Sequence, residues 1–205
     1  ARLGWGVVGT FGDNLKKVAR GMLGRSNFSL DQVDLLEKLG IYMNYNGYGS
    51  DLHDLHFTPT ELYQLAVNYD DPLDFISDSP EHFDKLETGY HQDFAAVESL
   101  QPLRASAATA VYMLPDQPWA RRVSGVFSND LTNHHPARAH AVITEKPTGN
   151  YLVSVRAPLL NKQGANKLCS QFPSGGGREA AAGINDLPSD QLDRFIDMFE
   201  QSFGT

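Results

Sequence analysis

The pattern of hydrophobic and polar positions after residue 106 predicts alternating strands and helices. Three apolar runs have the length of strands: residues 107–114, 139–145 and 151–156. The turn Pro147-Thr148-Gly149-Asn150 joins the last two as a hairpin. Helical spacing of apolar residues predicts three helices: residues 119–131, 161–171 and 188–203. Residues 180–184 fit either a helical turn or a strand. Because strands and helices alternate, we expect an α/β domain with a mixed sheet.

The part of the chain before residue 103 is predicted to be mainly helical, after one opening strand. An apolar run over residues 5–11 predicts a buried strand that ends at Gly12-Asp13. Apolar spacing and capping residues predict further helices over residues 14–23, 30–39, 58–68 and 80–99, and Asp71-Pro72 and Ser79-Pro80 bracket short helices. Ser29 is the expected N-cap of the helix over 30–39, and Gly40 is its expected end. Residues 41–50 are rich in aromatic, amide and glycine residues and are predicted to form a loop.

The opening strand has no earlier segment of this sequence to pair with, and the sequence does not begin with Met. A buried strand needs neighbours on which to form its hydrogen bonds. We therefore expect the sequence to be the C-terminal part of a longer protein. A mature chain trimmed by processing is the alternative.

Composition and charge narrow the function classes. The 205 residues are 41% hydrophobic and 20% charged, which is ordinary for a globular protein, and no apolar run is long enough to span a membrane. Cys169 stands alone, which excludes an internal disulfide and favours a reducing, cytoplasmic location. The net charge of −8 argues against non-specific nucleic-acid binding, yet residues 101–183 carry nine basic and four acidic side chains. Such a segment suits an anionic ligand in a basic cleft, while a solvated acidic face elsewhere explains the asymmetry equally well.

The strongest candidate site is the run Ser174-Gly175-Gly176-Gly177-Arg178, followed by small residues up to Gly183. Consecutive glycines let a ligand approach the backbone closely, because no side chain covers their N–H groups. We expect these N–H groups to form an anion nest, with the Arg178 guanidinium clamping a phosphate. A simple flexible turn is the alternative.

This glycine motif resembles that of the DHH-associated domain of DHH-family phosphoesterases, which include RecJ-like exonucleases and nanoRNases. The family motif is usually Gly-Gly-Gly-His, whereas this chain has Arg178 at the last position, which puts a proton-shuttle role there in doubt but not anion binding. Ser154-Val155-Arg156 matches the family's upstream Ser-x-Arg. The resemblance implies that the terminal phosphate or nucleotide of the substrate is held by Ser154, Arg156, Gly175, Gly176, Gly177 and Arg178.

A second segment carries the same resemblance. Val8-Gly9-Thr10-Phe11-Gly12-Asp13 is similar to the last metal-site motif of the RecJ-like catalytic domain, which implies that Asp13 is a metal ligand. Residues 39–49 resemble, more loosely, the Asn-containing bridge of that family. The family chemistry uses Mn²⁺ or Mg²⁺ in a two-metal site. The sequence holds no Asp-His-His triplet, so we expect this chain to bind no metal stably and to be inactive alone.

The resemblance therefore implies three parts: the end of a catalytic domain over 1–25, a helical connector over 26–103 and a DHH-associated substrate-binding domain over 104–205. The intact protein is expected to be a phosphodiesterase, exonuclease or phosphatase acting on short oligonucleotides or nucleotide phosphates. A non-catalytic module that binds nucleotides or nucleic acid is one alternative. A CoA-dependent acyltransferase is the other, and it requires a glycine loop between a strand and a helix. Edge strands of the sheet could also pair two copies into a homodimer.

Three smaller features have structural alternatives. His53 and His56 have the spacing of one helix face, but surface histidines explain them more simply. The aromatic residues Tyr42, Tyr45 and Tyr48 could stack on bases or pack against their own helix. Cys169 is expected to be a small buried residue.

Overall fold

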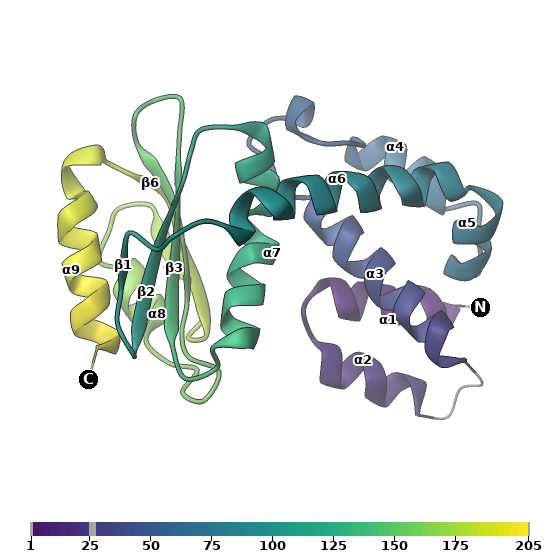
Figure 1. Cartoon of the computed structure of the whole chain (residues 1–205), viewed down its shortest axis with the longest axis horizontal. Coiled ribbons are helices and arrows are strands. Elements are labelled where there is room, and N and C mark those ends of the chain that lie inside the picture. Colours follow the sequence, from purple (N-terminus) through teal and green to yellow (C-terminus); the bar gives the residue numbers. More distant parts are fainter. Residues whose placement is uncertain (1, 25–27, 205) are drawn as a thin grey trace. The chain divides into compact units, whose positions relative to one another are not determined.

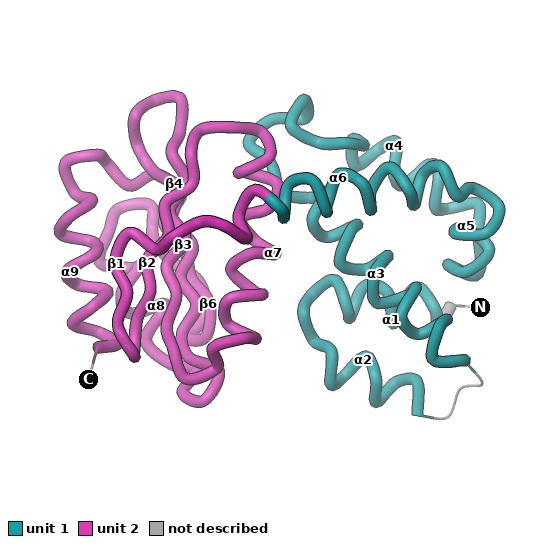
Figure 2. Tube along the Cα trace, viewed as in Figure 1, with its two compact units in different colours: residues 1–95 teal, residues 96–205 magenta. Residues whose placement is uncertain are grey.

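The computed structural model describes residues 2–24 and 28–204, and the chain divides into two compact units, residues 1–95 and 96–205 (Figure 2). The first unit is helical, as Figure 1 shows. Its helices are α1 (Arg2–Gly12), α2 (Lys16–Leu23), α3 (Leu30–Asn46), α4 (Pro59–Ala66), α5 (Pro72–Asp78) and α6 (Pro80–Glu98, which runs just past the boundary), with a short 3-10 turn at Leu52–Asp54. In the described residues no helix is both long and apolar enough to cross a bilayer.

The strand predicted over residues 5–11 is wrong, because these residues belong to helix α1. Val7, Val8 and Phe11 are buried, which is the spacing of one helical face, and an apolar run this short fits a helix or a strand equally well. Gly40 shows what holds α1 in place. A Cβ at Gly40 would lie 2.2 Å from the carbonyl oxygen of Val8, so glycine is needed where α1 and α3 cross.

The loop predicted over residues 41–50 is also wrong for most of its length, since α3 continues to Asn46. Gly40 lies inside the helix for close packing and does not end it. The start of α3 is confirmed: the Ser29 side chain accepts from the N–H of Gln32, whose side chain accepts from the N–H of Ser29. This capping box satisfies two N–H groups of the first turn.

The second unit is a mixed α/β domain, which confirms the expected fold class. Its six-stranded sheet has the order β1-β2-β3-β4-β6-β5. The strands are β1 (Arg104–Ala105), β2 (Thr109–Leu114), β3 (Ala139–Glu145), β4 (Tyr151–Arg156), β5 (Gly175–Gly177) and β6 (Ala181–Leu187); the helices are α7 (Pro118–His134), α8 (Ala165–Cys169) and α9 (Leu192–Phe203), with a 3-10 turn at Ser189–Gln191. Strands β2 and β3 are parallel and the other pairs are antiparallel.

Helices cover the two faces of this sheet differently. Helix α7 lies on one face, against β2, β3 and β4, and α9 lies on the other (Figure 1). Alternation along β4 follows these two sides: Val153 and Val155 join the core with Phe195 of α9, and Ser154 and Arg156 point to the face of α7. Cys169 is fully buried in the core, as predicted.

Candidate functional site

The glycine motif folds as part of the sheet and not as a loop. Gly175, Gly176 and Gly177 form the edge strand β5, which pairs with β6 so that Gly176 lies opposite Gly183. Arg178 and Ala181 exchange backbone hydrogen bonds of 2.8 and 3.2 Å, which closes a tight turn between the two strands. Successive N–H groups of a strand point in alternate directions, so the expected nest of three converging amides is not formed.

The hydrogen bonds of the ladder also occupy glycine amides. Because Arg178 and Ala181 form a hydrogen-bonded pair, the alternation of an antiparallel ladder makes Gly176 and Gly183 the next such pair. The N–H of Gly175 donates to the carbonyl oxygen of Phe172 at 2.9 Å. The N–H groups of Gly175 and Gly176 are therefore already engaged in backbone hydrogen bonds.

The register across β4, β6 and β5 brings the predicted phosphate-binding residues into two neighbouring rows. In the first row Arg156 lies opposite Ala181, and Ala181 lies opposite Arg178. In the second row Ser154 lies opposite Gly183, which lies opposite Gly176. The strands are about 4.8 Å apart, so the Cα atoms of the two arginines are separated by roughly 10 Å. We call the first row the arginine row and the second row the glycine floor.

Arg156 is held in place by residues beside it. Its Nε donates to Oδ1 of Asn129 at 3.2 Å, and its Nη1 donates to Oγ of Ser154 at 2.9 Å. Asn129 belongs to α7, so this helix fixes the direction of a side chain on β4. Asn129 was not among the residues predicted from the sequence. An amide on the helix that follows β2 gives no signal until the helix is placed on the sheet.

The three glycines of β5 differ in whether the fold would accept a side chain at their position. A Cβ at Gly175 would lie 1.8 Å from the carbonyl oxygen of Cys169, on the face packed against α8. Gly177 has a φ of +146°, which L residues rarely adopt. A Cβ at Gly176 would meet no atom within 4 Å. The space above Gly176 is therefore open.

His140 is a second residue of the site that was not predicted from the sequence. It lies opposite Arg156 on β3 and is fully buried, and neither ring nitrogen has a hydrogen-bond partner in the part of the chain that the structure describes. Burial, reinforced by the nearby charges of Arg138 and His135, lowers the pKa of His140 from 6.5 to about 4. At neutral pH the arginine row therefore borders an uncharged imidazole.

Asp13, the predicted metal ligand, lies in the first unit. It follows a helix and not the strand end that the family motif implies, and its side chain is exposed. Within residues 2–24 and 28–204 no group of three His, Cys, Asp or Glu side chains is arranged to hold a metal ion. One exposed carboxylate does not fit a two-metal centre.

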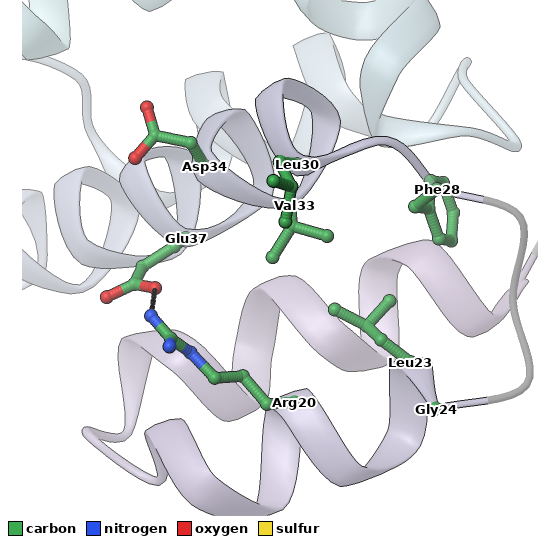
Figure 3. Close-up of a pocket in the computed structure, with 8 residues that line it drawn as sticks. All are labelled: Arg20, Leu23, Gly24, Phe28, Leu30, Val33, Asp34 and Glu37. Carbon is green, nitrogen blue, oxygen red and sulfur yellow. Dashed lines mark hydrogen bonds and ion pairs between the residues drawn. The ribbon is translucent and has the colours of Figure 1, made fainter.

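The first unit has a groove between α2 and α3, shown in Figure 3, and Arg20, the basic side chain in its lining, is paired with Glu37. Glu37 accepts from Arg20 at 3.2 Å and pairs with Lys16 at 2.9 Å. Most of the other lining residues are apolar, among them Leu23, Phe28 and Val33. The one cation in the described lining, Arg20, is paired with Glu37, so nothing in this groove points to a phosphate site.

His53 and His56 do not form a metal site, and Tyr42 and Tyr45 pack inside the first unit. His53 is exposed, whereas the ring of His56 lies 2.8 Å from the hydroxyl of Tyr45, so the two histidines do not converge on one ion. Tyr42 and Tyr45 are buried, and the Tyr45 hydroxyl donates to the buried Asp93. These aromatic rings pack inside the unit and are not available to stack on bases.

No protein-family model and no curated protein sequence matches the chain. Among solved structures, a pGpG-specific phosphodiesterase from Vibrio cholerae is 12% identical, with 95% of this chain and 57% of that chain covered and a TM-score of 0.41. An exopolyphosphatase-related protein from Bacteroides fragilis is 16% identical, with 91% and 54% covered and a TM-score of 0.44. The chain thus spans little more than half the length of these structures.

Proposed function

We propose that this chain is the C-terminal, substrate-binding part of a metal-dependent phosphoesterase of the DHH type, a hydrolase of short oligonucleotides or nucleotide phosphates. The observation that carries the proposal is the arginine row: Arg156 on β4 and Arg178, directly after β5, lie on either side of Ala181. Guanidinium groups present several N–H donors in a plane and bind phosphate through two of them at once. Ser154 adds a hydroxyl at the border of the same floor.

The acidic residue next to Arg178 in the sequence is engaged elsewhere. Glu179 is the acidic residue nearest to Arg178 along the chain, and its carboxylate accepts from the N–H of Gly164 at 3.0 Å at the start of α8. Arg178 itself is exposed. A phosphoryl group between the two arginines would therefore gain charge-assisted hydrogen bonds without displacing that carboxylate.

Binding and turnover separate in this proposal. The binding residues lie within the second unit, whereas Asp13 is the one proposed ligand for Mn²⁺ or Mg²⁺. Further ligands would have to come from chain outside this sequence. We therefore expect the purified 205-residue chain to bind nucleotides and to show no hydrolysis with Mn²⁺. Turnover by this chain would contradict the inactive-fragment part of the proposal and leave the binding part standing.

Calorimetric titration with adenosine monophosphate and with inorganic pyrophosphate tests the binding site. Replacing Arg156 or Arg178 with Ala should weaken each ligand about tenfold or more, because each change removes a charged hydrogen-bond donor worth roughly 1.5–3 kcal/mol. Arg194→Ala is the matched control, since Arg194 lies on α9 and its Nη1 donates to Gln191 at 3.0 Å. If Arg156→Ala binds like the unchanged chain, the site is misassigned.

Two other functions remain distinguishable. A non-catalytic nucleotide-binding module would use the same arginine row, and it predicts that even the longer protein does not hydrolyse nucleotides. The CoA-dependent acyltransferase is disfavoured by the fold. Its pyrophosphate would sit where glycines open a helix, whereas Gly175–Gly177 form a strand that turns into another strand.

A further inference from the structure

Resting on the proposed function, we infer that the glycine floor receives the flat base of a nucleotide while the arginine row beside it holds the phosphate. A surface without side chains and a surface of two arginines lie side by side on one face of the sheet. Gly176 and Gly183 are adjacent positions without side chains, and Arg156 and Arg178 lie in the next row. The ligand class is thus a nucleotide and not an inorganic phosphate chain.

Gly176 lacks a side chain although the fold does not require glycine at this position. Gly175 is needed because of the Cys169 carbonyl, and Gly177 because of its positive φ. Gly183 is needed because a Cβ there would lie 2.7 Å from the carbonyl oxygen of Val153. Gly176 has neither a positive φ nor a close neighbour, so alanine would fit there.

Glycine inside a strand is unfavourable, since it loses more backbone entropy on folding than alanine and offers no side chain for packing. A glycine that the fold does not need therefore indicates that something else requires the space above it. That space lies on the same face as Ser154 and the arginine row. A ligand part that enters there must be bulky enough to be blocked by a methyl group.

The chemistry of the glycine floor indicates which part of a nucleotide it contacts. The amides of Gly176 and Gly183 are used in the ladder, so they cannot donate to a phosphate above them. A planar ring needs no such donor, because its face makes van der Waals and weak C–H contacts with a flat peptide surface. Charged donors lie one row away, at a distance suited to the phosphate of the same nucleotide. The floor therefore fits the base.

The test compares three ligands by calorimetry on the full 205-residue chain: adenosine monophosphate, ribose 5-phosphate and inorganic pyrophosphate. Gly176→Ala and Gly176→Val fill the floor in two steps. We expect adenosine monophosphate to bind about 10-fold to 100-fold more weakly to Gly176→Val, with a smaller loss for Gly176→Ala. Ribose 5-phosphate and pyrophosphate should change less than about twofold.

Controls separate this inference from the proposed function. Gly21→Ala places a methyl group at another glycine with open space, on α2 in the first unit, and should change no affinity. An unaltered far-ultraviolet circular dichroism spectrum of each Gly176 variant checks its fold. If none of the three ligands binds the unchanged chain, the proposed function fails, and the inference with it. If Gly176→Val weakens all three ligands alike, or ribose 5-phosphate as much as adenosine monophosphate, the inference is overturned and the proposed function stands.

Discussion

Adjacent glycines in one strand should respond in opposite ways to the same substitution. Gly175→Ala places a methyl group 1.8 Å from the carbonyl oxygen of Cys169 and 3.1 Å from that of Phe172. Both obstacles are backbone atoms, so no flexible side chain can move aside. Gly176→Ala places the same methyl group where it meets nothing within 4 Å. The pair thus isolates packing from the general preference for alanine over glycine.

The size of the effect follows from what must move. The Cys169 carbonyl accepts the N–H of Phe172 at 3.0 Å, and displacing it weakens that bond, which is worth about 1 kcal/mol. Overpacking in a filled core costs a further 1–3 kcal/mol, roughly. We therefore expect Gly175→Ala to lower the free energy of unfolding of the second unit by about 3 kcal/mol. Gly176→Ala should change it by less than about 0.5 kcal/mol or raise it slightly.

Urea unfolding followed by the fluorescence of Trp119 measures this difference in the unit that contains it, because Trp119 lies on α7. A Trp5→Phe background removes the other tryptophan, which belongs to the first unit. The two variants are compared with the same background chain. If Gly176→Ala destabilises as much as Gly175→Ala, strand β5 does not have the register described above, and the floor built on it is lost.

Other predictions concern stability in each unit. Because the folded pKa of His140 is about 4 and its ordinary value is 6.5, the unfolded chain binds the extra proton, and stability should fall by up to about 3 kcal/mol as the pH drops from 6.5 to 4. His140→Leu should flatten that part of the urea-midpoint profile; an unchanged slope would contradict the assignment. Asn46→Leu should cost roughly 2–4 kcal/mol by thermal unfolding, since its amide bonds three backbone groups at His56 and Phe57. Tyr45→Phe should cost about 1–3 kcal/mol, because it removes a donor to a buried carboxylate, and an unchanged melting temperature would show that this bond is not important.

Local patterns in the second unit predicted most of its elements. Strands β3 and β4 and their hairpin are confirmed with the predicted bounds, because alternating apolar residues and the turn Pro147-Thr148-Gly149-Asn150 both act over a few residues. Helix α7 extends beyond its predicted ends, and α8 is shorter than predicted. Ends of helices depend on what packs beside them, which a single sequence does not show.

Failures in the first unit have one physical cause. Gly40 signals a helix end when it is considered alone, yet here it serves the crossing of α1 and α3. The apolar run over 5–11 was compatible with two structures, and the choice depended on the same crossing. Long-range packing decided both cases, and residues far apart in the sequence supplied it.

The order of strands, and not the glycine run alone, creates the candidate site. Strand β6 lies between β4 and β5. The tight turn after Arg178 leads from β5 into β6, which places Ala181 between the two arginines. Had β5 paired directly with β4, the glycines would lie inside the sheet, away from its open edge. Both arginines are candidates from the sequence alone, but the distance between them is a property of the register of β4, β6 and β5. Gly183 allows β6 to approach β4, because a Cβ there would lie 2.7 Å from the carbonyl oxygen of Val153. The residue types are therefore enough to predict a phosphate site, whereas the open space above Gly176 is seen only in the fold.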